Sequence, residues 1–151
     1  MTYAQRILAP IDFSAMSEPA VDHAMALADV FGASVTLLHA HDMPTAMGAI
    51  VPGAHLETDL AMIRSAAQRR LDHLAARLRH HGFADVRVAL VAGPPVETIL
   101  RYATEGEFDL VVMGTHGRSG LRRILIGSVA EGVLRKAHCP VVTVHLPIVE
   151  R

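Results

Sequence analysis

The stretch Val111-Val112-Met113-Gly114-Thr115-His116-Gly117-Arg118-Ser119-Gly120 decides how this chain folds. It begins as a short apolar run and ends in a basic loop that carries glycines, and Gly127-Ser128-Val129 follows with nine residues between Gly117 and Gly127. This order predicts the end of a buried strand, a loop, and then the start of a helix. Glycine lets the backbone approach a ligand closely, and a helix N-terminus offers unpaired N–H groups. The stretch therefore predicts a phosphate site.

Strands and helices alternate along the whole chain. Short apolar runs predict strands at 7–11, 34–40, 86–91, 109–113 and 141–144. Helical spacing predicts a helix from 17 to 31, with Ser17 as a possible cap and Gly32 as the stop. It also predicts helices from 58 to a stop at 80–82, from 95 to a stop at 106, and from 128 to 137. Nearly continuous apolar strands joined by helical crossovers indicate a parallel sheet buried on both faces. We therefore expect an α/β fold, an open doubly wound sheet with helices on both faces.

The length of 151 residues suits one domain, and we expect 1–151 to form it. Between 41 and 57, prolines and glycines break any periodicity, so this long connection is either a functional loop or a mobile one. Ligands bind beyond the carboxyl ends of the strands in such sheets. Asp12 follows the first strand and the glycine loop follows the fourth, so both are expected at that edge.

Composition excludes several classes of protein. A formal net charge of −1 argues against a nucleic-acid-binding protein that works through gross electrostatics. The single Cys139 excludes an internal disulfide, which fits a reducing cytoplasm. The N-terminus has no apolar leader with a cleavage site, and no apolar run approaches the roughly 18–20 residues of a membrane span. We expect a cytoplasmic protein without a membrane segment.

The glycine loop matches neither of the two commonest nucleotide motifs. A Gly-Lys-Ser/Thr sequence is absent, so the lysine of a phosphate loop is missing, and the glycines do not form a dinucleotide fingerprint. Two candidates also have purely structural readings. Ser128 to Glu131 fits a capping box, and Asp12 can simply cap a turn.

Three further groups of side chains are candidates for a chemical role. Arg118, Arg122 and Arg123 are either a solvated loop or a counter-charge to an anion, and His116 either touches phosphate or lies on the surface. His39, His41 and Asp42 have the spacing of a metal site on a strand, but no cysteine or carboxylate cluster accompanies them. We expect no protein-only metal site. Cys139 is expected to be a packed side chain, because adjacent His138 points to the opposite face.

The chain resembles the universal stress protein family, in its ATP-binding branch. The residues that carry the resemblance are Ile7 to Ser14, Leu37 to Ala40, Asp109 to Leu121, and Gly127-Ser128-Val129 continuing to Cys139-Pro140-Val141. The family's nucleotide pattern is Gly, two residues, Gly, nine residues, and Gly followed by Ser or Thr. Gly114, Gly117, Gly127 and Ser128 match it without a gap. The resemblance covers essentially the whole chain except 41–57.

The resemblance implies a fold, a ligand and a set of contacts. The fold is Rossmann-like, of the adenine-nucleotide alpha-hydrolase type, with strand order 3-2-1-4-5. Pro10, Asp12 and Ala40 would border the adenosine, with Met113 against the base or sugar. Gly114, Gly117, Gly127, Ser128 and Val129 would hold the phosphates, and Arg118 is a further candidate for cofactor binding. The cofactor would be ATP, with Mg²⁺ held mainly by phosphate oxygens.

The family is typically dimeric, which implies a homodimer through the last strand, from Val141 to Leu146. An apolar edge strand that is left bare is a liability, which supports the same expectation. We expect a nucleotide-dependent regulatory module of the stress response, with no catalytic residues. The alternative from another class is a slow ATPase or phosphotransferase that uses the same site. No residue that would orient a water can be named from the sequence. A flavodoxin-type or receiver domain would share the topology but explains neither Asp12 nor the Gly127-Ser128 spacing.

Overall fold

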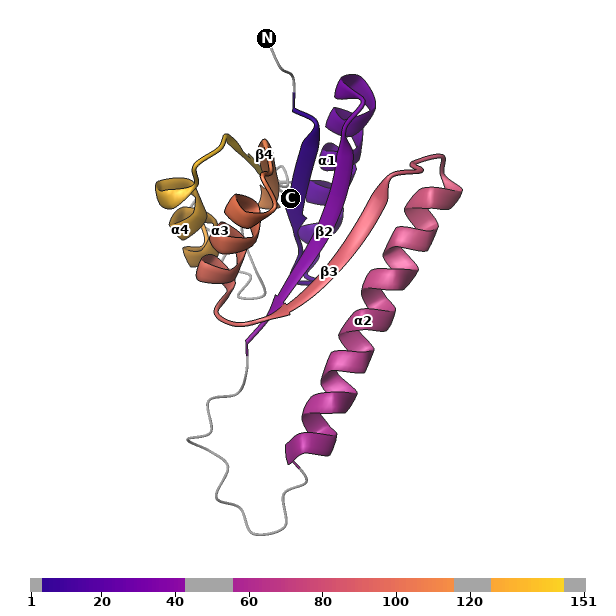
Figure 1. Ribbon diagram of the computed structural model, residues 1–151, viewed down its shortest axis with the longest axis vertical. Coiled ribbons are helices and arrows are strands. Elements are labelled where there is room, and N and C mark those ends of the chain that lie inside the picture. The colour runs from indigo at the N-terminus through magenta and orange to yellow at the C-terminus, as the bar shows by residue number, and fades with distance from the viewer. Residues whose placement is uncertain (1–3, 43–55, 116–125, 146–151) are drawn as a thin grey trace, which may run out of the picture.

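A computed structural model describes residues 4–42, 56–115 and 126–145 (Figure 1). Of the residues singled out above, His116, Gly117, Arg118, Arg122 and Arg123 lie outside these ranges. The same holds for most of the connection between 41 and 57 and for Leu146.

Five parallel strands form one sheet in the order β3-β2-β1-β4-β5. The strands are β1 (Arg6–Pro10), β2 (Ser34–His41), β3 (Val86–Ala92), β4 (Leu110–Gly114) and β5 (Val141–Val144). Each lies within a residue of its predicted bounds. The predicted α/β class, parallel sheet and strand order 3-2-1-4-5 are therefore confirmed.

Within the described residues, four helices cover the sheet on both faces, as predicted. They are α1 (Ser17–Phe31), α2 (Leu56–His80), α3 (Pro95–Glu105) and α4 (Ser128–Lys136). Figure 1 shows α1 and α2 on one side of the sheet and α3 and α4 on the other. From β1 the chain adds β2 and β3 on one side, and after α3 it adds β4 and β5 on the other side, so the winding reverses between β1 and β4. A doubly wound sheet opens a crevice at this point of its carboxyl edge.

Alternating side chains of the central strands belong to two separate hydrophobic cores. In β1, Ile7 and Ala9 face the core beneath α1 and α2, whereas Leu8 faces the core beneath α3 and α4. In β4, Val112 belongs to the first core and Val111 to the second. All five are fully buried. This two-sided burial explains why the strands are continuously apolar in the sequence.

Glycine permits close packing on the α3 and α4 side. A Cβ atom on Gly132 would lie 2.9 Å from both γ carbons of Val96, so the two helices approach only because that side chain is absent. Gly93 has φ of +139°, and a Cβ there would lie 2.7 Å from the Thr98 hydroxyl oxygen. Its freedom lets the chain turn from β3 into α3.

The helix α2 extends beyond the sheet. Its apolar stripe runs from Leu60 through Ile63, but burial begins only at Ala67. Met62 and Ile63 are 64% and 59% exposed. The amphipathic pattern therefore predicts the helix correctly, while the described part of the fold covers only its C-terminal half.

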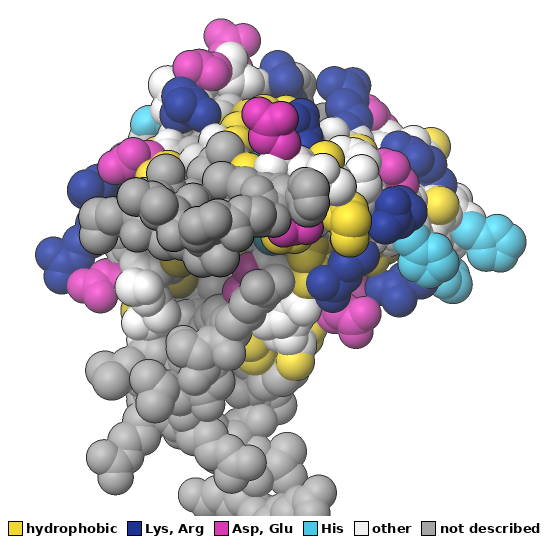
Figure 2. All heavy atoms as spheres, turned by 90° about the horizontal axis from the view of Figure 1, so that it is seen from below, with side chains coloured by type: hydrophobic (Ala, Val, Ile, Leu, Met, Phe, Trp, Pro, Cys, Tyr) yellow, Lys and Arg dark blue, Asp and Glu magenta, His cyan; other side chains and the backbone are white. Residues whose placement is uncertain are grey.

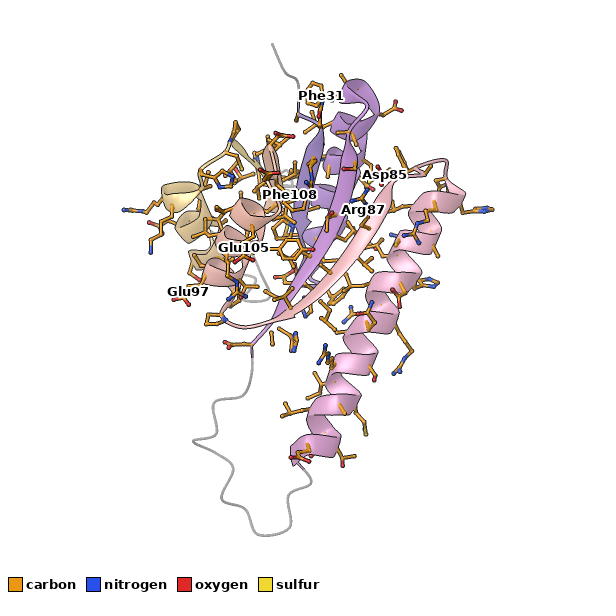
Figure 3. The ribbon with its side chains drawn as sticks, in the orientation of Figure 1. Phe31, Asp85, Arg87, Glu97, Glu105 and Phe108 are labelled. Atoms are coloured by element: carbon orange, nitrogen blue, oxygen red, sulfur yellow. The ribbon has the colours of Figure 1, made fainter. Side chains whose placement is uncertain are left out.

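Local contacts hold the strand ends at the amino edge of the sheet. The Arg6 guanidinium lies 5.2 Å from the centroid of the Phe108 ring, and Arg87 forms an exposed ion pair with Asp85 at 3.4 Å (Figure 3). The Asp109 carboxylate accepts hydrogen bonds from the backbone N–H groups of Gln5 and Arg6. These contacts fix the amino ends of β1, β3 and β4 relative to their surroundings.

Candidate functional site

A cavity of about 280 Å³ lies at the carboxyl ends of β1 and β4. This volume is close to the lower end of the ~300–1,000 Å³ that is usual for ligand pockets. Its walls come from the β1–α1 loop, β2, the start of α3, the end of β4 and the first turn of α4. The lining residues are Pro10, Ile11, Asp12, Met16, Ser17, Leu38, Ala40, Pro95, Ile99, Met113, Gly114, Thr115, Gly127, Ser128, Val129 and Ala130.

The residues predicted to bind a nucleotide meet around this cavity. Eight of the ten line it, and they are Pro10, Asp12, Ala40, Met113, Gly114, Gly127, Ser128 and Val129. The other two, Gly117 and Arg118, lie outside the described residues. Segments more than a hundred residues apart in sequence thus converge on one place, as parallel topology requires.

The first turn of α4 points backbone donors at the cavity. The helix begins at Ser128 with Gly127 as its N-cap, and the N–H of Glu131 donates the first intrahelical bond, to the Gly127 carbonyl at 2.9 Å. The N–H groups of 128–130 precede that bond, so they have no partner within the helix. Together with the helix dipole they form an anion-binding end.

The capping-box interpretation of Ser128 is wrong. Gly127 occupies the N-cap position, Ser128 is the first helical residue, and no side-chain hydrogen bond caps the helix. The Ser128 side chain is exposed on the rim of the cavity. Its hydroxyl is therefore not used to start the helix.

Backbone hydrogen bonds hold the end of β4 in register with its neighbours. The Thr115 N–H donates to the Val144 carbonyl at 2.9 Å, and the Gly127 N–H donates to the Thr115 carbonyl. These bonds fix the start of α4 relative to β4 and β5. The first turn of α4 is consequently placed by the sheet itself.

Gly114 ends β4 against the β1–α1 loop. A Cβ atom at this position would lie 3.1 Å from both the Cβ and the carbonyl oxygen of Met16. The absent side chain lets the loop close over the end of β4, and Met16 lines the cavity. Gly114 therefore shapes the cavity through packing, not through positive φ.

Asp12 is held by two serines. Its Oδ1 atom accepts hydrogen bonds from the Ser14 N–H at 2.9 Å and from the Ser17 hydroxyl at 2.8 Å. The Asp12 N–H in turn donates to Ser17 Oγ at 3.1 Å. Asp12 thus caps the turn and also lines the cavity, so the two readings of this residue are compatible. Ser17, predicted to cap α1, bonds Asp12 instead, since the N-cap is Met16.

Asp12 is the only titratable side chain among the described residues that line the cavity. Partial burial by itself raises the pKa of this carboxyl, but the hydrogen bonds from Ser14 and Ser17 outweigh burial and hold the pKa below its ordinary value of 3.8. The group is therefore a carboxylate at neutral pH. An anionic ligand here must keep its phosphates near α4 and away from Asp12.

Apolar side chains form the remaining wall. Leu38, Ile99 and Met113 belong to the core beneath α3 and α4 and present their surfaces to the cavity. The prediction named Met113 but missed Leu38 and Ile99. Leu38 lies two residues before Ala40 on the same strand face, and Ile99 lies one turn after Pro95, so strand and helix periodicity could have identified both.

His39 of β2 has structural surroundings. The His39 Nδ1 atom is 2.8 Å from the Ile11 carbonyl, and its ring packs on Phe13 with centroids 4.7 Å apart. Among residues 4–42, 56–115 and 126–145, no group of three His, Cys, Asp or Glu side chains could hold a metal ion.

Cys139 lies at the opposite edge of the sheet from the cavity and packs against the core beneath α3 and α4. Burial, together with the Asp109 charge, raises the pKa of its thiol, which disfavours a thiolate nucleophile. His138 instead pairs with the Thr104 hydroxyl at 3.1 Å.

In the described part of the chain no helix is long and apolar enough to cross a membrane.

The model of the universal stress protein family matches residues 4–145. Universal stress protein MJ0531 of Methanocaldococcus jannaschii is 34% identical over 143 residues, which is 95% of this chain and 83% of the relative. Universal stress protein MJ0577 of the same organism is 30% identical over 153 residues, covering 93% and 94% of the two chains.

Solved structures agree with the sequence matches. The structure of MJ0577 has a TM-score of 0.82 and 30% identity, covering 97% of this chain and 99% of its own. A universal stress protein solved in complex with cAMP has a TM-score of 0.67 and 26% identity, covering 96% and 99%.

Proposed function

Because this chain belongs to the universal stress protein family, we propose that it binds ATP in the cavity between β1, β4 and α4 and acts as a nucleotide-dependent regulatory module. The observation that carries the proposal is the first turn of α4, whose free N–H groups line a cavity with one apolar wall.

The phosphates belong at the start of α4 in this proposal. The amides of 128–130 supply donors that water alone would otherwise satisfy, and the exposed Ser128 hydroxyl adds one side-chain group. Gly127 lets the ligand approach the backbone, since it has no side chain. Gly117 and Arg118 are proposed as additional phosphate contacts on the sequence pattern alone.

The adenosine belongs against the apolar wall. Ala40, Leu38 and Met113 offer a surface that suits a flat aromatic base, and Pro10 borders it. Asp12, ionised and held by Ser17, can accept a hydrogen bond from a ribose hydroxyl or a base amino group. A relative of the same fold is known in complex with cAMP, an adenine nucleotide.

Mg²⁺ would enter with the nucleotide, held by phosphate and water oxygens. It would supply charge neutralisation at the phosphates. Among the described lining residues there is no lysine or histidine, and Asp12 is engaged by the turn. The proposal is therefore retention of ATP, with slow hydrolysis as the alternative outcome.

We also propose that the functional unit is a homodimer paired through β5. This strand is one edge of the sheet, and three of its four residues are partly exposed. Unpaired backbone groups on such an edge favour pairing with another strand.

Thermal unfolding in the presence of nucleotides tests the proposal. At ATP-Mg concentrations a hundredfold above Kd, binding to the folded state adds about 2.7 kcal/mol. For a domain of this size that raises Tm by roughly 5–10 °C. We expect this shift with ATP and a much smaller one with GTP.

Filling the cavity provides the matched control. Ala40→Phe places a ring inside the cavity and should abolish the shift, whereas Ala61→Phe adds the same ring to an exposed position of α2 and should preserve it. Circular dichroism checks that both variants fold. Equal shifts in the two variants, or no shift of the parent protein with any adenine nucleotide, would refute the proposal.

A further inference from the structure

A second, larger cavity lies on the other side of the β1–α1 loop. Its volume is about 610 Å³, within the ordinary range for small-molecule sites. It opens between this loop and the middle of α2. The lining residues are Ile11, Phe13, Ser14, Ala15, Ser17, Glu18, Ala66, Arg69, Arg70, His73, Leu74 and Arg77.

Basic side chains from one helix dominate this cavity. Arg69, Arg70, His73 and Arg77 recur at helical spacing, so they share the side of α2 that faces the loop. Figure 2 shows dark-blue and cyan side chains gathered on the side of the molecule where α2 lies. Glu18 is the only carboxylate among the described lining residues.

The cavity has fewer acidic side chains than basic ones among its described lining residues. Glu18 approaches Arg77 at 3.5 Å, and both side chains are largely solvent-exposed. Within the described ranges Arg69 and Arg70 form no ion pair. Two guanidinium groups therefore face the cavity without a carboxylate to neutralise them.

One of these cations is held in place by packing. The Arg70 guanidinium carbon lies 4.1 Å from the centroid of the Phe13 ring, which is close enough for a cation–π contact. Phe13 has a φ of +61°, an uncommon conformation for a bulky residue, and its ring also packs on the His39 ring and against the core beneath α1 and α2. This stacking restricts Arg70 before any ligand arrives, so less side-chain entropy is lost on binding.

We propose that this cavity binds a small phosphate-bearing anion, separately from the nucleotide cavity. Guanidinium groups donate in pairs to phosphate oxygens, and a phosphate has enough oxygens to engage Arg69 and Arg70 together. Ile11 and Leu74 supply an apolar surface for the remainder of the molecule. Because the chain as a whole carries a net charge of −1, recognition is local to this cluster.

The two cavities are neighbours but have different walls. Ile11 and Ser17 line both, whereas α2 contributes only to the basic cavity and α4 only to the nucleotide cavity. NMR shifts of the α2 backbone amides therefore report on the basic cavity alone. The proposal stands independently of whether ATP binds.

Titration of the ¹⁵N-labelled full chain with inorganic pyrophosphate tests it. We expect saturable shifts of the α2 amides around Arg69 to His73, in the presence of saturating ATP as well as without it. Replacing both arginines, as Arg69→Gln with Arg70→Gln, should weaken this binding at least about tenfold, since charge-assisted hydrogen bonds are lost. Arg64→Gln, an exposed change on the same helix outside the cavity, should leave it unchanged.

A second variant covers the case in which the double variant misfolds. Ala66→Glu adds a carboxylate to the cavity at an exposed position and should also abolish pyrophosphate binding. The proposal is overturned by shifts that stay linear in pyrophosphate, by equal affinities in the Arg64→Gln and cavity variants, or by displacement with ATP. Equal binding of succinate would refute selectivity for phosphate.

Discussion

In the proposed site, single residues around the cavity between β1, β4 and α4 act mainly through their backbone. Gly114 matters for the side chain that it lacks, Gly127 as the N-cap of α4, and 128–130 for their N–H groups. Asp12 and Ser128 are the two lining residues whose side chains carry distinct predictions. The Asp12 carboxylate is hydrogen-bonded within the fold, whereas the Ser128 hydroxyl caps nothing. Replacing Asp12 should therefore change stability, and replacing Ser128 should change ligand affinity.

Ser128→Ala should weaken ATP binding about tenfold or more, because a hydrogen bond to a charged phosphate is lost. Its effect on the free energy of unfolding should stay within about 0.5 kcal/mol, since the hydroxyl caps nothing. Isothermal titration calorimetry and urea unfolding measure the two effects. Ser34→Ala, at the amino end of β2, is the control and should leave affinity unchanged. An unaltered Kd in Ser128→Ala would remove the hydroxyl from the site.

Asp12→Asn should change how stability depends on pH. Since the folded-state pKa of Asp12 lies below its ordinary value of 3.8, its carboxylate stabilises the fold above that value. This contribution is lost as pH falls from about 3.8 through the folded-state pKa. Urea unfolding between pH 2.5 and 6 (roughly the range in which carboxylates titrate) should therefore show a flatter acid limb in Asp12→Asn. Asp29→Asn, at an exposed position of α1, should retain the parent slope. The opposite pattern would contradict the assigned hydrogen bonds.

At the scale of elements, the spacing of apolar residues and the positions of glycines were enough to predict most helices and strands. Continuous apolar runs such as 109–113 predicted β4 because it is buried on both faces. Gly32, with φ of +65°, marked the end of α1. The same reasoning misassigned the helix caps at Ser17 and Ser128. A hydroxyl near a helix start has several partners within reach, and the sequence does not rank them.

The contact between α3 and α4 makes a prediction of its own. Gly132→Ala should destabilise the protein by about 1–3 kcal/mol, because its methyl group would overlap Val96. In a Val96→Ala background the same change should become neutral or stabilising, since alanine favours helices over glycine. A double-mutant cycle by denaturant unfolding measures the coupling. Equal effects in both backgrounds would mean that the helices do not meet at this point.

At the scale of the whole molecule, the proposed dimer depends on the exposed edge of β5. The backbone N–H of Val111 donates to the Pro140 carbonyl, and that of Thr115 donates to the Val144 carbonyl. The backbone N–H and C=O groups of the even-numbered residues of β5 therefore face β4. The N–H of Thr143 therefore points away from the sheet. Thr143→Pro removes this outward donor and should shift a dimer toward monomer, with Thr143→Val as the control. Sedimentation velocity decides the matter. A monomeric parent protein, or a dimer that persists in Thr143→Pro, would exclude pairing through β5.

The site was less predictable than the fold. Residues at strand ends, such as Asp12 and Gly114, could be assigned to one edge because parallel topology places them there. The apolar wall of Leu38 and Ile99 was missed, since core residues and ligand-facing residues look alike in a sequence. The basic cavity was missed as well, because it depends on how α2 lies against the β1–α1 loop. That placement is set by tertiary packing, not by local pattern.

The most direct test of the central proposal is a crystal structure of the protein grown with ATP and Mg²⁺. We predict the phosphates against the N–H groups of 128–130 and the adenine against Leu38 and Met113. The Asp12 carboxylate should lie on the adenosine side of the ligand. A nucleotide bound elsewhere, or an empty cavity at saturating ATP, would contradict the account.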